Sequence, residues 1–436
     1  MRTMEQVEVG KYQPYPEYKD SGVEWVGDMP HHWQTKPAFA AVMEQCIKNS
    51  DGAESNVLSL SYGNIVERDV ENNFGLLPES FNTYQIVNPG DIVLRLTDLQ
   101  NDKRSLRVAR STLRGIITSA YLKLVCGDEL DNRYAYRLLH SYDTTKVFYG
   151  MGGGLRQSMK FEDFRRLPFL LPPAEEQRTI AAFLDYETAR IDKLIAQHQR
   201  LIELLKEKRQ AVISRAVTKG LNPDAPMKDS GVEWLGEVPE HWLVSSLKFI
   251  YKNLDYKRIP LSAEERGSKQ GDYPYYGASG IIDSIDDYLF STDHVLVGED
   301  GANLVMRSTP IAFVATGQYW VNNHAHILRM NDGLNSYWAA VIENLDISPF
   351  VTGSAQPKLT AEALGNLIVA YPKTLQERIE IQEFINREKP KFTTLIDRAE
   401  HQVHFLKERR TALISAAVTG KIDLRGWTAS IQEAAA

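Results

Sequence analysis

The chain has few cysteines and no long apolar run, and these absences narrow the class of protein. Only two cysteines, Cys46 and Cys126, occur in 436 residues, which is too few for a disulfide scaffold or a structural zinc site. No uninterrupted apolar stretch approaches the ~20 residues that span a bilayer. The N-terminal residues also lack the apolar core of a signal peptide. The sequence therefore predicts a protein of the reducing cytoplasm without a membrane segment.

The motifs of two enzyme classes are missing as well. An adenine methyltransferase needs an Asn/Asp-Pro-Pro-aromatic motif to hold a flipped base, but the one Pro-Pro pair lies in Leu171-Pro172-Pro173-Ala174. The Gly-x-x-x-x-Gly-Lys-Ser/Thr motif of a translocase does not occur. His324 and His326, with Glu299 or Asp300, could offer metal ligands, but we favour hydrogen bonds within their domain. We expect no catalytic residue, no metal site and no cofactor in this chain.

What the sequence does contain is a second copy of two of its own segments. Residues 19–33, KDSGVEWVGDMPHHW, return at 228–242 as KDSGVEWLGEVPEHW, with 11 of 15 positions identical. Residues 206–218, KEKRQAVISRAVT, return at 407–419 as KERRTALISAAVT, with 9 of 13 identical. The stretches between the repeated segments share little. We call the repeated segments of each half its frame and the unlike stretch between them its insert. We expect internal pseudo-twofold symmetry, with each half presenting its own surface to its own target.

The repeats divide the chain into seven expected segments. Glycine and proline mark turns in each Trp-x-Gly-x-x-Pro-x-His-Trp block, and we interpret the block as a docking segment before the first strand of a domain. Short β-like runs between turn signals predict inserts that are mixed and rich in strand. The segments are an N-terminal part with the first block (1–33), insert 1 (34–172), a first long helix (173–220), a linker with the second block (221–242), insert 2 (243–371), a second long helix (372–420) and a tail (421–436).

A long helical stretch follows each insert. Residues 174–219 contain no proline or glycine, Gly220 follows as a stop, and the apolar residues approximate a heptad seam. The second stretch ends at Gly420 and contains Pro390, which we expect to break or kink it. The part after Pro390 would be about 42 Å long, a length comparable with one turn of DNA.

These helices predict how the two halves are joined. A single helix with one apolar seam is unstable in water, so we predict an antiparallel coiled coil; separate packing of each helix on its own domain is the alternative. The expected fold class is α+β, with two α/β insert domains in a pseudo-twofold arrangement, separated by two long helices. The residues expected on this spacer are Leu194, Leu201, Leu205, Leu395, Val403 and Leu406.

Two unlike domains on a stiff spacer suit a split DNA site. The net charge of −7 argues only mildly against nucleic acid, because binding depends on where the basic groups cluster. Residues 103–114 hold five basic residues and no acidic one, and the loop 275–280 offers hydroxyl groups that can reach phosphates. The alternatives are a solvated charged loop and a turn whose tyrosines pack in the core. The residues predicted to touch DNA are Lys103, Arg104, Arg107, Arg110, Arg114, Tyr275, Tyr276, Ser279 and Lys358.

The order of these parts resembles the specificity subunit of type I restriction-modification systems. The Trp-x-Gly-x-x-Pro-x-His-Trp blocks are similar to the segments that precede its target-recognition domains, and Leu171-Pro172-Pro173-Ala174-Glu175-Glu176-Gln177-Arg178 is similar to the start of its conserved helix. Gly90-Asp91-Ile92-Val93 and Tyr273-Pro274-Tyr275-Tyr276-Gly277 resemble recurrent patterns of the target-recognition domains. The second helix start, Pro372-Lys373-Thr374-Leu375-Gln376-Glu377-Arg378, departs from the pattern, which puts the geometry of that helix in doubt.

The resemblance implies a DNA-recognition subunit without catalytic activity of its own. Such a subunit reads a bipartite, asymmetric double-stranded DNA site through two target-recognition domains, and its helices set the gap and dock the partners. Two methyltransferase subunits would use S-adenosylmethionine, and two restriction subunits would use ATP and Mg²⁺. The competing hypothesis is a coiled-coil scaffold or a regulatory relative without sequence-specific DNA binding.

Overall fold

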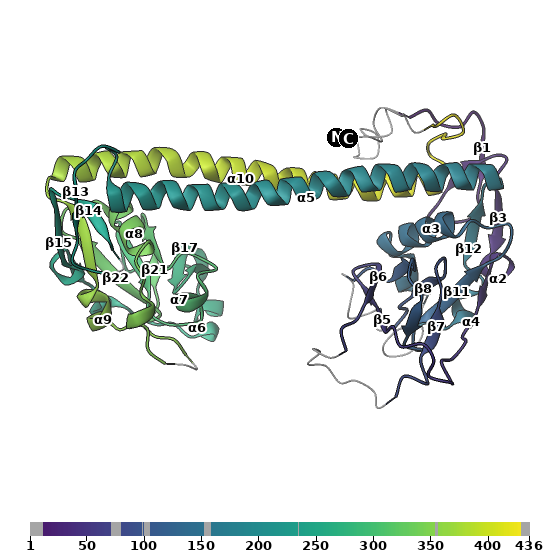
Figure 1. Cartoon of the computed structure of the whole chain (residues 1–436), viewed down its shortest axis with the longest axis horizontal. Coiled ribbons are helices and arrows are strands. Elements are labelled where there is room, and N and C mark those ends of the chain that lie inside the picture. The colour runs from purple at the N-terminus through teal and green to yellow at the C-terminus, as the bar shows by residue number, and fades with distance from the viewer. Residues whose placement is uncertain are drawn as a thin grey trace. The chain divides into compact units, whose positions relative to one another are not determined.

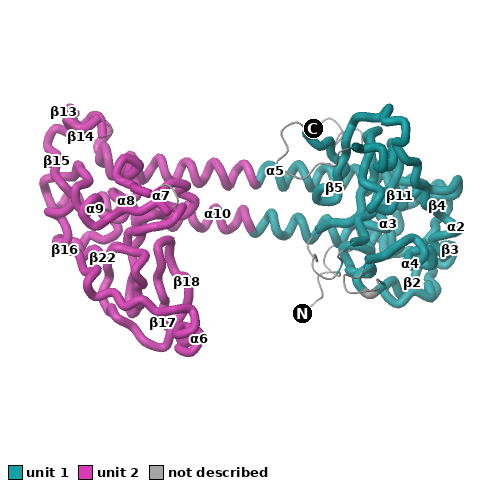
Figure 2. Tube along the Cα trace, turned by 90° about the horizontal axis from the view of Figure 1, so that it is seen from below, with its two compact units in different colours: residues 1–198, 401–436 teal, residues 199–400 magenta. Residues whose placement is uncertain are grey.

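The fold consists of two compact units, which a computed structural model describes over residues 12–70, 80–97, 99, 105–151, 158–233, 235–353 and 356–428. Unit 1 comprises residues 1–198 and 401–436, and unit 2 comprises residues 199–400 (Figure 2). Two long helices, α5 (Ala174–Lys219) and α10 (Leu375–Val418), each contribute to both units (Figure 1). Among the described residues, no helix is both long and apolar enough to cross a bilayer.

Unit 1 contains the first repeat block and insert 1. The block forms a hairpin of β1 (Tyr18–Asp20) and β2 (Asp28–Pro30). Next, β3 (Gln34–Pro37) pairs with β12 (Pro168–Leu171), so the two ends of the insert lie side by side. The central sheet has the order β4 (Val42–Glu44), β11 (Leu122–Cys126), β8 (Ile92–Leu94) and β9 (Val108–Arg110). The smaller elements are α2 (Ala38–Ala41), β5 (Leu58–Ser61), β6 (Asn64–Glu67), β7 (Gln85–Val87), β10 (Gly115–Ile117), α3 (Asn132–Thr144) and α4 (Phe161–Phe164).

Unit 2 repeats this plan with different residues. Its block forms the hairpin of β13 (Met227–Asp229) and β14 (Glu237–Pro239), and β15 (Trp242–Ser246) pairs with β23 (Ile368–Pro372). The central sheet has the order β16 (Tyr251–Asn253), β22 (Ala325–Met330), β19 (His294–Gly298) and β20 (Ala312–Ala315). The smaller elements are α6 (Ala263–Ser268), β17 (Gln270–Gly277), β18 (Gly280–Ile285), α7 (Asn303–Met306), β21 (Trp320–Val321), α8 (Asn335–Glu343) and α9 (Ala361–Asn366).

The two central sheets have the same topology although their sequences differ. In both, the first strand in the chain pairs with the fourth, the fourth with the second, and the second with the third, all antiparallel. A helix follows the last strand of each central sheet: α3 lies against β9, and α8 lies against β19 and β20. The units therefore share one fold around unlike residues, as the repeated frame predicts.

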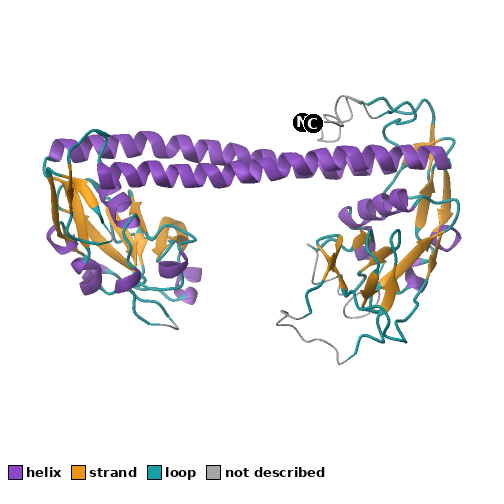
Figure 3. Ribbon diagram, in the orientation of Figure 1, coloured by secondary structure: helices purple, strands orange, loops and turns teal. Residues whose placement is uncertain are grey.

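The long helices run antiparallel within each unit. In unit 1, Ile180 and Phe183 near the start of α5 share a hydrophobic core with Ile414 and Val418 near the end of α10. In unit 2, residues 213–217 at the end of α5 share a core with Ile381 and Ile385 near the start of α10. Both helices are drawn as unbroken ribbons in Figure 3. The antiparallel helix pair predicted from the apolar seams is thus present.

The ends of the helices agree with the sequence, but the interior of α10 does not. Gly220 (φ +77°) and Gly420 (φ +71°) follow the two helices in the left-handed conformation that glycine tolerates. A side chain on Gly420 would also collide with Pro30, since its Cβ would lie 2.3 Å from Pro30 Cδ. Of the break or kink expected at Pro390, the break does not occur: α10 continues from Leu375 to Val418 with Pro390 inside it. The antiparallel partner helix and the two cores stabilise α10 despite the missing N–H.

Unit 1 buries one histidine that carries no charge at neutral pH. His140 on α3 is 3% exposed, and its Nδ1 has no hydrogen-bond partner among the described residues. Burial, with the nearby charges of Arg410 and Arg137, lowers the pKa of His140 from 6.5 to about 4. The ring therefore stays neutral in the folded chain at pH values where an exposed histidine already carries a proton.

Unit 1 should lose stability as the pH falls from about 6.5 to 4. In this range the unfolded chain binds a proton at His140 and the folded chain does not. The free energy of unfolding therefore has its full value above pH 6.5 and falls below it, by at most about 3 kcal/mol. Urea unfolding of His140→Gln should show a flatter pH dependence than that of the parent chain. The exposed His31 provides the control: if His31→Gln flattened the curve equally, burial of His140 would not be the cause.

Candidate nucleic-acid interface

A buried glutamate at the start of α5 holds the first repeat block. The carboxylate of Glu176 accepts hydrogen bonds from His32 Nε2 at 2.8 Å and from Trp33 Nε1 at 3.0 Å. The hydroxyl of Tyr15 donates to the same carboxylate, because burial and the Glu176 charge raise the pKa of this phenol and keep it protonated. The Glu176 side chain is only 5% exposed. Three donors from the N-terminal part of the chain thus converge on one carboxylate.

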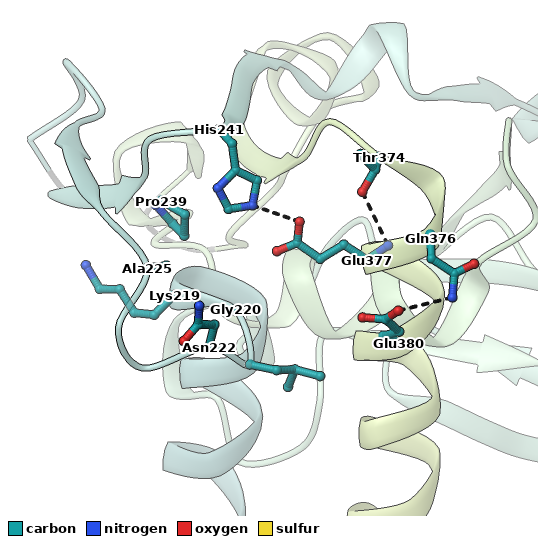
Figure 4. A pocket seen from close by; sticks show the side chains of 11 residues that line it. Lys219, Gly220, Asn222, Ala225, Pro239, His241, Thr374, Gln376, Glu377 and Glu380 are labelled. Atoms are coloured by element: carbon teal, nitrogen blue, oxygen red, sulfur yellow. Dashed lines mark hydrogen bonds and ion pairs between the residues drawn. The ribbon is translucent and has the colours of Figure 1, made fainter.

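The second block makes the same contact in unit 2. Glu377 in the first turn of α10 accepts from His241 Nε2 at 2.8 Å and from Trp242 Nε1 at 3.0 Å. The position that matches Tyr15, 209 residues later, is Asp224, and Glu377 is more exposed, at 25%. A cavity of about 400 Å³ is lined in part by Glu377, His241 and Lys219 (Figure 4).

The repeat blocks are therefore docking segments, as predicted, but their glutamate partners were missed. Glu176 and Glu377 are 201 residues apart, the same offset as the repeated segments 206–218 and 407–419. That offset is the signal that could have found them, even though the second helix start departs from the family pattern. We refer to the two sites as the carboxylate junctions.

The predicted basic run does not form one DNA-facing strip. Arg107 is fully buried, and its guanidinium donates to the main-chain oxygens of Arg95 (3.1 Å) and Thr97 (2.7 Å). Its main-chain N–H donates to Asp143 Oδ2 at 2.6 Å. Arg107 thus has a structural role in place of the expected DNA contact, because these hydrogen bonds hold its side chain inside unit 1.

The other members of the run have different surroundings. Lys103 and Arg104 lie outside the described residues. Arg110 is half-buried and donates to Asn132 Oδ1 at 3.3 Å. Arg114 is 65% exposed and pairs with Glu54 at 3.1 Å. Arg114 can therefore reach a phosphate if it leaves Glu54, a surface ion pair of small net worth.

The tyrosines of the second predicted segment belong to the core. Tyr275 is 1% exposed and Tyr276 is 9% exposed, which agrees with the alternative that they pack inside the domain. Ser279 alone is exposed, in the turn between β17 and β18. Neither tyrosine presents its ring to a ligand at the surface, so their predicted DNA contact is not supported by this geometry.

Lys358 is half exposed and is held by an internal charge network. Its Nζ lies 3.1 Å from Glu299 Oε1, and Arg258 Nη1 lies 2.6 Å from Glu299 Oε2. Burial alone would raise the pKa of Glu299, but the hydrogen bonds from Arg258 and Lys358 and the charge of His326 hold it below its ordinary value. Glu299 therefore positions two cations at this edge of the central sheet.

Two of the residues considered for a metal, His326 and Glu299, belong to the same network. Ligand atoms of Asp255, Glu299 and His326 lie within 4.8 Å of one another. His326 Nδ1 lies 2.6 Å from Asp255 Oδ2, and its Nε2 lies 2.8 Å from the main-chain oxygen of Leu359. His324 Nδ1 lies 2.9 Å from the carboxylate of Asp300. Both histidines therefore make the hydrogen bonds within their domain that we favoured.

The spacer residues differ in exposure. Leu406 is buried (7% exposed), and Leu205 and Val403 are half-buried. Leu194, Leu201 and Leu395 are 37%, 43% and 47% exposed, so they are not sealed between α5 and α10. The helix pair thus leaves apolar side chains available to a partner.

Comparisons with known proteins show what parts of the chain are similar to. Residues 239–392 match the family model described as "Type I restriction modification DNA specificity domain". A putative type I restriction enzyme specificity subunit of Haemophilus influenzae is 32% identical over 116 residues, which cover 26% of this chain and 29% of that protein. The EcoprrI specificity subunit of Escherichia coli is 28% identical over 134 residues, 30% of each chain. The matched stretches therefore span less than a third of these relatives.

The fold of the chain also has a solved counterpart. A chain from a structure of type I R-M complex assembly and conformational transition aligns with a TM-score of 0.65 at 13% identity, covering 89% of this chain and 98% of that one. This likeness confirms the expected fold class. Residues 239–392 are thus similar to the DNA specificity domain of type I restriction-modification systems, and the chain shares its fold with a protein of such a system.

The two carboxylate junctions should differ in strength. Glu176→Gln places an amide N–H₂ among three donors in a buried site, and we expect it to lower the free energy of unfolding by about 1–3 kcal/mol. Glu377→Gln should cost less, because that side chain is more exposed and lacks the tyrosine. Urea unfolding of the two single variants measures the difference. Equal losses, or a larger loss at Glu377, would contradict the description of these sites.

Proposed function

We propose that this chain is the DNA-recognition subunit of a type I restriction-modification complex. It reads a bipartite, asymmetric double-stranded DNA site, with one half of the site bound by each unit. The observation that carries the proposal is the repeated frame with unlike inserts: both units have the same sheet topology and the same carboxylate junction. A frame of this kind places two different surfaces in equivalent positions, as an asymmetric split site requires.

The chain supplies recognition, and its partners supply the chemistry. Two methyltransferase subunits transfer the methyl group of S-adenosylmethionine, and two restriction subunits use ATP and Mg²⁺. The exposed apolar residues of α5 and α10 support a docking role, since exposed leucines on a helix pair are typical of a surface that a partner covers. These residues are Leu194, Leu201, Leu204, Leu395 and Phe405. The complex would act in the cytoplasm, where the host DNA lies.

Phosphate affinity would come from basic side chains that the structure leaves accessible. Arg114 and Lys358 each keep half or more of their side-chain surface exposed. Arg114 is held by Glu54, and a phosphate can replace this surface partner with little loss. If Lys358 turns to a phosphate, Glu299 keeps its pair with Arg258. Such contacts fix the register of a protein on DNA, whereas bases are read by other groups.

Methylation mapping tests this function directly. The chain is expressed with the methyltransferase subunit encoded beside it in a host without DNA methylation, and N6-methyladenine is mapped across the genome. We expect one motif of two short unlike sequences separated by a fixed gap. Expression of the methyltransferase subunit alone is the control and should give no such motif. An assembled complex without new methylation would instead favour a coiled-coil scaffold or a regulatory relative.

A further inference from the structure

One hairpin in unit 1 presents an aromatic ring at an unusual place. Strands β5 and β6 pair from Leu58↔Glu67 to Ser61↔Asn64, which leaves Tyr62 and Gly63 as a two-residue turn. Both turn residues have positive φ, +48° for Tyr62 and +77° for Gly63, as in a type I′ turn. Asparagine, aspartate or glycine normally takes the first of these positions, because a bulky side chain is strained there.

Few contacts of the Tyr62 ring compensate this backbone strain. Its side chain is 86% exposed, so the ring makes few contacts that would stabilise the fold. Among the described residues, the other non-glycine residues with positive φ are Lys146 and Arg307. Arg307 donates to the main-chain oxygens of Glu343 and Leu345, and its conformation therefore serves the fold. A strained and exposed residue is evidence for a role outside the folded chain.

The hairpin packs against unit 1 at its base and at one of its two turn residues. Leu58 and Ile65 are buried in a small core with strands of the central sheet. Gly63 lies against Leu106, since a side chain at Gly63 would come within 3.0 Å of Leu106 Cβ. Asn64 and Val66 are exposed beside Tyr62. The hairpin is thus anchored at its base and at Gly63, and it leaves the uncharged Tyr62 ring exposed.

Unit 2 has a hairpin at the corresponding point of its topology. Strands β17 and β18 follow the first strand of their central sheet, as β5 and β6 follow theirs. This hairpin exposes Ser279 at its turn and Ile281 and Ile282 next to it, at 59% and 53%. Each unit therefore offers an exposed hairpin of its own composition, which is the arrangement expected of two readers with different targets.

We propose that the β5–β6 hairpin enters a groove of duplex DNA and that Tyr62 contacts the bases of one half-site. This inference rests on the proposed function and names a reading element for it. A two-stranded ribbon fits the major groove, which is about 12 Å wide. The phenol can donate or accept a hydrogen bond at a base edge, and its ring can pack on a thymine methyl group. The uncharged tip avoids repulsion by phosphates, and Arg68 and Arg114 lie near the base of the hairpin.

The test separates strain from recognition. The chain, assembled with its methyltransferase subunits, is titrated with a fluorescent duplex that carries the mapped motif and with a duplex of scrambled sequence. Tyr62→Gly removes the ring while glycine accepts the positive φ, so the variant should unfold at the same or a higher temperature. We expect its affinity for the motif to fall about tenfold or more, with its affinity for the scrambled duplex unchanged.

A matched control and a second measurement complete the test. Phe39 on α2 is another exposed aromatic residue of unit 1, at 52%, and Phe39→Ala should leave both affinities unchanged. In methylation mapping, Tyr62→Gly should relax one half of the motif and leave the other half intact. Wild-type affinity and an unaltered motif in Tyr62→Gly would overturn this inference alone. If the wild-type complex bound the motif duplex no more tightly than the scrambled duplex, both the proposed function and this inference would be contradicted.

Discussion

The hydrogen bonds of Glu176 and Glu377 are the interactions on which the rest of the architecture depends. Each carboxylate sits in the first turn of a long helix, where a negative charge is also favoured by the helix dipole, and receives the histidine and tryptophan of a repeat block. The end of the other long helix meets the same tryptophan: Gly420 lies beside Trp33, and Gly220 beside Trp242. One carboxylate therefore fixes three segments that are far apart in the sequence.

This arrangement explains why the inserts are free to differ. Each insert begins and ends in two paired strands next to its junction, β3 with β12 and β15 with β23. The frame thus specifies only where an insert starts and stops. Between these points, the two central sheets keep one topology around different apolar residues, and the exposed hairpins and loops differ completely. In many folds the residues that bind a target lie on surface loops, and the secondary structure beneath holds these loops in place.

The sequence predicted the frame better than the surface. The repeated blocks, the glycines that end the helices and the antiparallel pair followed from local patterns and from the need to bury apolar seams. Of the break or kink expected at Pro390, the break does not occur, since α10 continues through this residue. Arg107 could not be placed, because its partners Asp143 and Tyr149 come from other segments. The strain at Tyr62 depends on the register of β5 and β6, which no sequence pattern specified.

On the proposed function, each unit reads its own half-site. Replacing insert 2 (243–371) with a second copy of insert 1 (34–172) and mapping methylation by the assembled complex tests this proposal. The sequence repeats predict a pseudo-twofold relation between the halves, so two copies of one reader should recognise an inverted repeat, and we expect a palindromic motif built from one half of the original. An unchanged asymmetric motif, or two half-sites in the same orientation, would contradict it.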